Sequence, residues 1–236
     1  MIGTLINVLT IIIGTIAGML FGARIPEHTR RTIMHGLGLI TLAYGVSMFL
    51  KTNNVIIVVV SILLGGILGE WLKLEERIHT AGKVLEIRFL RNGNPDSSLG
   101  RGFLVATLVF CVGPMAILGS IQDGLSGDYN LLAIKAIMDG FASIAFSATL
   151  GAGVILSALS VLVYQGAISL LASQLQSVIT QPMMDEMVSV GGIILMALAA
   201  GSLLEIKPIR AASFLPALVI APIAIAVMTM LGIRLL

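Results

Sequence analysis

The sequence LLAIKAIMDGFASIAFSATLG, residues 131–151, combines membrane-like hydrophobicity with a regular row of polar side chains. A helix that crosses a bilayer needs about 20 predominantly apolar residues, and this stretch is long enough. Its polar residues follow at every fourth position: Lys135, Asp139, Ser143 and Ser147. Neighbours at that spacing touch on a helix, and charges at membrane depth usually face the interior of a bundle. The stretch therefore predicts a membrane-spanning helix with its polar row turned toward other helices.

The whole chain has the composition of an integral membrane protein. Hydrophobic residues make up 57% of the 236 residues and charged residues 11%, whereas about a quarter of the residues of a soluble domain are charged. The longest polar interruption, residues 73–101, is too short for a separate soluble domain. The first apolar stretch lacks a basic leader, so we interpret it as a span rather than a cleaved signal. We expect a single integral membrane domain over residues 1–236.

Eight apolar segments have about the length that crosses a bilayer, which predicts an all-α polytopic helix bundle of eight spans. The least secure boundary is TLGAG at 149–153, which leaves only a tight turn between the fifth and sixth spans. The segments cover residues 2–23, 33–50, 54–72, 102–120, 129–149, 152–172, 188–204 and 211–232.

The distribution of basic residues supports eight spans and predicts their orientation. Of the 14 lysines and arginines, eleven fall on one side and two on the other, with Lys135 inside a span. Cytoplasmic loops are enriched in basic residues, so both termini are predicted outside the cytoplasm. The segment 73–101 then becomes a cytoplasmic loop, either an amphipathic helix on the bilayer surface or an ordinary loop. A shorter acidic loop, residues 173–187, is expected outside.

Glycines recur on several spans in a pattern typical of close helix contacts. Gly14 and Gly18 of the first span match Gly65 and Gly69 of the third, a weak indication of parallel two-helix repeats. Small residues let helix backbones approach closely in lipid. We interpret these glycines mainly as packing positions, within the chain or in a homo-oligomer, although a few of them could instead line a path.

The fourth span is expected to be broken near its middle, at Gly113–Pro114. Proline lacks a backbone donor and clashes with the carbonyl four residues earlier. The freed backbone groups then need a partner at membrane depth. A simple proline kink and a discontinuous helix of the transporter type both fit this pattern.

The charged pair of the fifth span lies deep in the predicted bundle. Asp139 is nine residues from Asn130, or about 14 Å into the helix, near the bilayer midplane. Lys135 is shallower and is expected to snorkel outward, with Asp139 leaning toward it. Two interpretations remain open: an ion pair that fixes helix register, or a pair on a pathway for a solute, an ion or a proton.

The fourth and sixth spans extend this polar zone. A tight turn makes the fifth and sixth spans antiparallel neighbours, and the outer half of the fourth span is expected beside them. The residues predicted to line the pathway are Lys135, Asp139, Ser143, Ser147, Ser157, Tyr164, Gln165, Gln122 and Asp123.

The sequence contains no enzyme motif, and we expect no enzymatic activity. It lacks the metalloprotease, phosphate-binding and hydrolase motifs HExxH, GxxxxGK[ST] and GxSxG. His28, His35 and His79 are scattered in or beside cytoplasmic loops, and a single Cys111 excludes an internal disulfide. Topology explains the basic residues without nucleic acid. We expect no catalytic residue, metal or cofactor.

Several segments from the middle of the chain resemble one known family. They are FCVGPMAILGSIQDGLSGD (110–128), LLAIKAIMDGFASIAF (131–146), LGAGVILSA (150–158) and YQGAISLLA (164–172). They are similar to the YqgA/YdfK-like prokaryotic membrane proteins, a family defined by a domain of unknown function. The resemblance extends over almost the whole chain and implies a bacterial or archaeal inner membrane protein. It names no substrate, and it carries no site residue onto this sequence.

The sequence favours a transporter or channel for a small solute or ion, with Lys135 and Asp139 as its coupling or gating pair. The alternative is a membrane protein that does not transport but organises partners or senses lipid through residues 73–101. The expected partners are the lipid bilayer and an unidentified small solute or ion. A water-reached cavity at the pair would favour transport, and a dry helix contact would favour the structural role.

Overall fold

The computed structural model describes residues 1–22, 26–78, 80, 99–112 and 114–231, and these residues form helices and short connections. They divide into two compact units. Unit 1 comprises Met1–Gly36 and Ile78–Ser177, and unit 2 comprises Leu37–Arg77 and Val178–Leu236. Most of the predicted amphipathic segment 73–101 lies outside the described residues.

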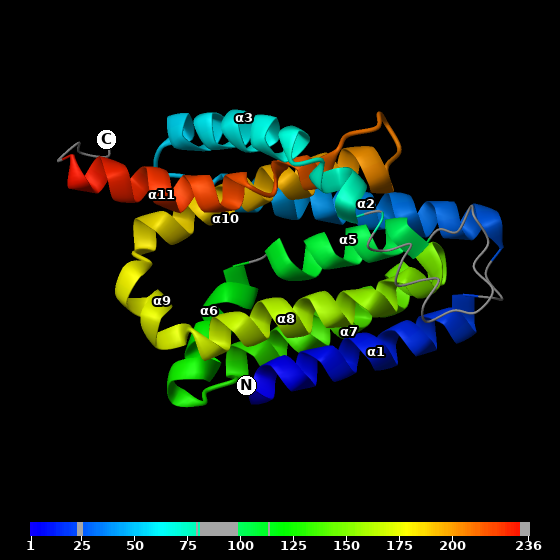
Figure 1. Ribbon diagram of the computed structural model, residues 1–236. Coiled ribbons are helices and arrows are strands. Elements are labelled where there is room, and N and C mark those ends of the chain that lie inside the picture. The colour runs from blue at the N-terminus through cyan, green and yellow to red at the C-terminus, as the bar shows by residue number, and fades with distance from the viewer. Residues whose placement is uncertain (23–25, 79, 81–98, 113, 232–236) are drawn as a thin grey trace. The chain divides into compact units, whose positions relative to one another are not determined.

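Unit 1 contains the polar row of residues 131–151. Its first helix is apolar and rich in glycine, and the others come from the middle of the chain (Figure 1). The elements are α1 (Ile2–Gly22), α5 (Leu99–Val112), α6 (Pro114–Ser126), α7 (Asn130–Leu150), a 3₁₀ turn η1 (Gly151–Leu156) and α8 (Ser157–Leu170). Two helices cross the division between the units: α2 (Glu27–Phe49) and α9 (Ala172–Val178).

The predicted break in the fourth span is confirmed. The segments Leu99–Cys111 and Met115–Ser126 are bent by 62° relative to each other. Pro114 is the first residue of α6, a position where the missing N–H costs nothing because it would have no helical partner. Gly113 itself lies outside the described residues. The helix continues to Ser126, beyond the predicted boundary at residue 120.

The helical run from Asn130 to Leu170 folds back on itself. Asn7 lies within hydrogen-bond distance of both Asp139 and Gln165. A straight helix would separate those two residues, 26 positions apart, by about 39 Å. The reversal follows α7, at Gly151, whose φ of 77° is a conformation that glycine adopts readily.

Contacts within unit 1 give the directions of its helices. Gly3 lies against Leu132 and Gly18 against Ser147, so α1 and α7 run parallel. The folded-back α8 is antiparallel to both. Gly153 packs on Leu99 and Ser160 bonds to Thr107, which makes α5 parallel to α8.

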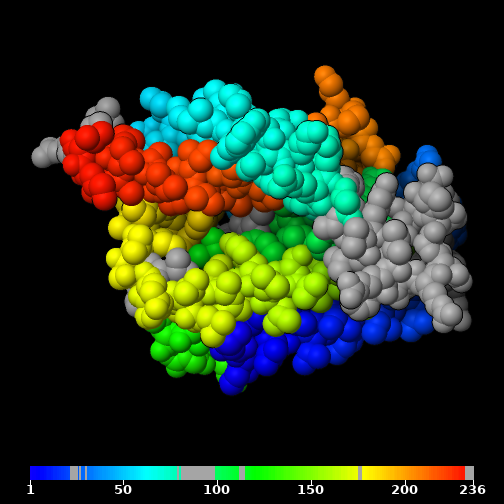
Figure 2. Space-filling view, viewed as in Figure 1, coloured from blue at the N-terminus to red at the C-terminus, as the bar shows by residue number. Residues whose placement is uncertain are grey.

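Unit 2 contains antiparallel helix pairs. Its α3 (Val55–Trp71) packs on η3 (Ala211–Phe214) and α11 (Ala217–Met230), with Gly65 against Ala217 and Gly69 against Ser213. Figure 2 shows α3, in cyan, lying along α11, in red. The C-terminal half of α2 packs in the same antiparallel way on α10 (Gln181–Leu198), which continues as a π-helical turn to Leu203.

The prediction of an acidic loop over residues 173–187 is wrong. Helix α9 covers Ala172–Val178, and α10 already begins at Gln181, with a proline in its first turn. Proline is well tolerated there, and the polar residues that follow occupy the first turns of a helix rather than a loop. Glu186 is consequently a buried helical residue.

The chain is a multi-pass membrane protein. Among the described residues, five helical stretches are long and apolar enough to cross a membrane, and the bent pair of α5 and α6 can be counted as a sixth. The 17-residue α3 is equally apolar but shorter. The finer prediction of eight spans stays a prediction.

Candidate functional site

The site is built on the parallel contact between α1 and α7. A side chain at Gly14 would collide with the carbonyl oxygen of Gly140, and one at Gly18 would collide with Ser147. The two backbones therefore touch, as small residues permit in lipid. This close contact brings polar side chains from the N-terminal halves of both helices to the same depth in unit 1.

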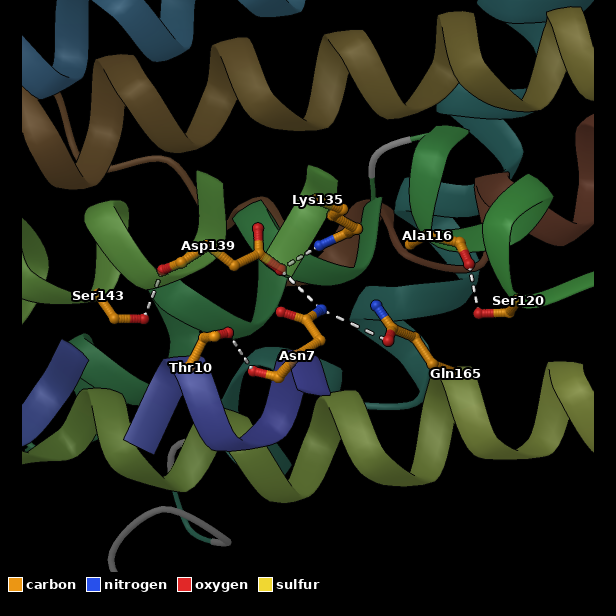
Figure 3. A network of polar contacts seen from close by, with 8 residues as sticks. All are labelled: Asn7, Thr10, Ala116, Ser120, Lys135, Asp139, Ser143 and Gln165. Atoms are coloured by element: carbon orange, nitrogen blue, oxygen red, sulfur yellow. Dashed lines mark hydrogen bonds and ion pairs between the residues drawn. The ribbon is translucent and has the colours of Figure 1, made fainter. Parts of the chain in front are cut away.

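Four polar side chains from three helices meet at that depth (Figure 3). Lys135 forms an ion pair with Oδ2 of Asp139, four residues along α7. The amide Nδ2 of Asn7, on α1, donates a hydrogen bond of 2.9 Å to the same carboxylate oxygen. It also lies 3.4 Å from Oε1 of Gln165, on α8. Asn7, Lys135, Asp139 and Gln165 are called the polar network below.

The network is sealed from the surface of unit 1. Asn7 and Gln165 are fully buried, and Lys135 and Asp139 are 5% and 7% exposed. The ammonium of Lys135 lies 5.9 Å from the centre of the Phe110 ring, a cation–π distance. The prediction that Lys135 snorkels outward is therefore wrong, because a carboxylate and an aromatic face hold its charge inside the bundle.

Asn7 is the network residue that sequence reasoning missed as a candidate site residue. An amide among the apolar side chains of residues 5–13 was the available signal, since an amide carries both donors and an acceptor. Its partner could not be inferred, because the contact joins residues 132 positions apart.

The orientation of the amides follows from the carboxylate. An ionised carboxylate only accepts hydrogen bonds, so Asn7 must turn its NH₂ group toward Asp139. The same NH₂ group faces the carbonyl oxygen of Gln165. Two polar atoms are then left without a protein partner: Oδ1 of Asn7, an acceptor, and Nε2 of Gln165, a donor.

The two serines of the row have partners inside their own helix. The Ser143 hydroxyl donates to the carbonyl of Asp139 at 2.7 Å, and the Ser147 hydroxyl donates to the carbonyl of Ser143 at 2.6 Å. Both are buried against the glycines of α1. Their small size lets α1 approach, and their hydroxyl protons are already donated.

The other predicted pathway residues occupy different places in unit 1. Ser157 is buried and donates to the carbonyl of Val154, and Tyr164 is half-buried on α8. Gln122 is exposed on α6. Among the predicted residues, the structure brings Lys135, Asp139 and Gln165 together.

Asp123 caps the start of α1. Its carboxylate accepts from the backbone N–H of Gly3 at 3.1 Å and lies 2.9 Å from the amino group of Met1. Negative groups are stabilising at a helix N-terminus, where backbone donors lack helical partners. Asp123 is therefore a helix cap and lies outside the polar network.

The polar network is chemically suited to hydrogen bonding and charge compensation. It combines one cation and one anion, which compensate each other, with two amides. Within the part of the chain that the structure describes, no three His, Cys, Asp or Glu side chains are grouped to hold a metal ion.

Comparisons with known proteins agree with the resemblance of residues 110–172. The model of the family "Protein of unknown function (DUF554)" matches residues 2–226, so the chain belongs to this family. The chain is 32% identical to the uncharacterized membrane protein YdfK of Bacillus subtilis (strain 168), over 99% of this chain and 100% of YdfK. It is 28% identical to the uncharacterized protein YqgA of Escherichia coli (strain K12), over 93% and 94% of the two chains. No solved structure matches.

Proposed function

We propose that this member of the DUF554 family is a transporter or channel for a small solute or ion, and that unit 1 contains its pathway. The observation that carries the proposal is the polar network, whose buried atoms include a donor and an acceptor without a protein partner. Unpaired polar atoms are expensive at membrane depth. A hydrogen-bonding solute, or the water that accompanies an ion, would supply the missing partners.

Packing alone does not require these side chains. Two apolar residues in place of a buried ion pair often leave stability unchanged or raise it. Ionisable residues inside membranes are expensive and mark solute, ion or proton pathways in many transport proteins. Lys135 and Asp139 are therefore assigned a gating role: the pair is closed when buried, and a passing solute competes for its hydrogen bonds.

The proposal includes eight crossings with both termini outside the cytoplasm. Each helix direction within a unit agrees with it: α1 and α7 run parallel, whereas α3 and α11 run antiparallel. The reversal at Gly151 supports counting the fifth and sixth crossings separately. Reporter fusions at Asp128, at Thr180 and after Leu236 are expected to report outside, and fusions at Arg30 and Lys207 inside. A cytoplasmic C-terminus would overturn this topology.

A flux screen tests the function. The purified protein in liposomes is offered sodium, potassium, chloride, amino acids, organic acids, urea and glycerol. Asp139→Asn keeps the shape of the side chain but leaves Lys135 without its anion, and it is expected to lose most of the flux. Asp128→Asn is the matched control, because Asp128 is exposed in the turn before α7. Absence of protein-dependent flux for every class of solute would overturn the proposal.

A second candidate is a membrane protein in which the polar network only fixes helix register. It is favoured by the burial of Lys135 and Asp139, which resembles a dry contact. The groove of about 260 Å³ along the contact of α1 and α7 is lined by other residues, among them Ile13, Ile137 and Phe141. Under this candidate, replacing both charges by apolar residues would leave every cellular phenotype of the protein intact.

A further inference from the structure

The inner face of α1 carries polar atoms at three depths, and none of them has a protein partner. They are Oγ1 of Thr4, Oδ1 of Asn7 and Oγ1 of Thr15. All three residues are fully buried. Thr4 and Thr15 are 11 residues apart, three helical turns, so they lie on the same face and about 16 Å apart along the helix. We infer that a small uncharged hydrogen-bonding solute crosses unit 1 along this face of α1; the inference rests on the proposed function.

The unpartnered state of Thr4 and Thr15 distinguishes this face from the serine row of α7. Hydroxyls on membrane helices usually bond to the carbonyl four residues earlier, as those of Ser143 and Ser147 do. The hydroxyls of Thr4 and Thr15 make neither this bond nor another hydrogen bond within the protein. Their hydroxyls are therefore available to a solute. Nε2 of Gln165 adds an available donor from α8 beside Asn7.

The class of solute follows from charge. The unpartnered atoms are hydroxyl and amide groups, and the two charges of the network already compensate each other in an ion pair. An ion entering this site would be buried without a counter-charge, which is far more expensive than burying a neutral polar molecule. A neutral solute with at least one donor and one acceptor, such as an alcohol or an amide, matches Nε2 of Gln165 and the oxygens of α1.

An apolar residue divides this face. Ile11 is fully buried and lies between Asn7 and Thr15 on the same side of α1. Apolar constrictions close pathways by excluding water. The closed state of the path thus contains a barrier that one substitution can weaken. Ile13, which is 64% exposed on the outer side of the same helix, provides a matched control.

Thiol accessibility tests the route. In a Cys111→Ala background, Thr4→Cys, Thr15→Cys, Ser143→Cys and Ile16→Cys are each treated with methyl methanethiosulfonate, a small uncharged reagent. Thiols react as thiolates, which form where water reaches, so the two α1 positions are expected to react about tenfold faster than Ser143→Cys and the lipid-facing Ile16→Cys. Equal rates at all four positions, or the fastest reaction at Ser143→Cys, would overturn the route.

Swelling of protein-containing liposomes tests the class of solute. Glycerol, urea and acetamide are expected to enter faster than into empty liposomes, whereas sodium and potassium salts are not. Ile11→Ser should raise the entry of glycerol several-fold, Ile13→Ser should leave it unchanged, and Thr15→Val should lower it. Binding of a fluorescent detergent probe and gel filtration confirm that each variant is folded.

The outcomes separate this inference from the proposed function. Protein-dependent passage of sodium or potassium without passage of neutral solutes would overturn the inference and leave a transport function standing. Passage of no solute at all would overturn both. Entry of glycerol that is insensitive to Ile11→Ser and Thr15→Val would place the route elsewhere and overturn the assignment to α1.

Discussion

The contact of α1 with α7 in unit 1 and the contact of α3 with α11 in unit 2 solve the same packing problem with different chemistry. Each uses two glycines four residues apart, Gly14 and Gly18 or Gly65 and Gly69, to bring a helix onto its neighbour's backbone. The partner runs parallel in unit 1 and antiparallel in unit 2. Glycine spacing therefore permits close approach without specifying the direction of the partner.

A carboxylate from another helix also binds the backbone at the start of each glycine-rich helix. Asp123 accepts the N–H of Gly3 at the start of α1. Glu186, fully buried on α10, accepts the backbone N–H groups of Asn53 and Asn54 at 2.7 and 3.0 Å, beside the start of α3. These acids are structural in both units, because they supply acceptors to backbone donors that lack helical partners.

The difference between the two contacts is the polar network. The contact of α1 with α7 contains an ion pair and two amides, whereas the described contact of α3 with α11 contains glycine, alanine, serine and aromatic groups. Ser61, buried on α3, and Ser213, buried on η3, contribute hydroxyls to the corresponding interior. Close packing of α3 on η3 and α11 is thus accompanied by a half-exposed ion pair, Arg210 with Glu70, in place of the buried pair of unit 1. The charges of unit 1 need another reason, which is the basis of the transport proposal.

The largest expected effect is that of removing one charge of the pair. Asp139→Leu leaves the ammonium of Lys135 buried without its anion, which we expect to lower the free energy of unfolding by about 3–5 kcal/mol. The double variant Lys135→Met with Asp139→Leu should regain nearly all of it. Titration with denaturing detergent measures both. Equal, mild losses in the single and double variants would mean that the pair is exposed and not part of the interior.

Glycine substitutions test whether the two contacts are equally close. Gly18→Ala places a methyl group against the Ile144 carbonyl, and Gly69→Ala places one against the Ser213 carbonyl. Each should lower the free energy of unfolding by about 1–3 kcal/mol. Gly36→Ala is the control, since nothing lies within 4 Å of its added methyl group. A large loss of stability in one variant and none in the other would mean that the two helix contacts are not equally close.

Removing the carboxylate beside the start of α3 should lower stability less than the glycine substitutions do. Glu186→Ala removes the acceptor of the Asn53 N–H and one of two acceptors of the Asn54 N–H, which also donates to Oγ1 of Thr52, and we expect it to cost about 1–2 kcal/mol. Thermal unfolding in detergent measures this loss of stability. Retention of full stability would indicate that other groups satisfy these donors.

The smallest expected effect is that of the serine hydroxyls. Ser143→Ala and Ser147→Ala keep the small volume that α1 packs on, and each removes a bond to the same helix. We expect changes in unfolding free energy below about 0.5 kcal/mol and unchanged flux. A selective loss of flux in either variant would mean that these hydroxyls take part in the pathway. The polar chemistry that distinguishes unit 1 from unit 2 would then include the serine row.

The sequence predicted the elements better than it predicted their contacts. Hydrophobic length gave the helices, and Gly113–Pro114 gave the break, because both are local properties of the chain. The row at Lys135 and Asp139 identified the ion pair, since residues at that spacing touch on a helix. Asn7 was missed as a site residue because its role depends on residues more than a hundred positions away. The outward path of Lys135 was wrong because Asp139 and the ring of Phe110, from another helix, hold its charge inside the bundle.

The most direct test of the central claim is the flux of the double variant Lys135→Met with Asp139→Leu. Wild-type protein and variant are compared in the same liposomes, with glycerol, urea, sodium and potassium as solutes. Since the ion pair of Arg210 with Glu70 in unit 2 is about half exposed rather than buried, we predict that the variant keeps the stability of the wild-type protein and loses its gated flux. A variant that is as stable as the wild-type protein and moves the same solute at the same rate would show that the pair serves packing alone.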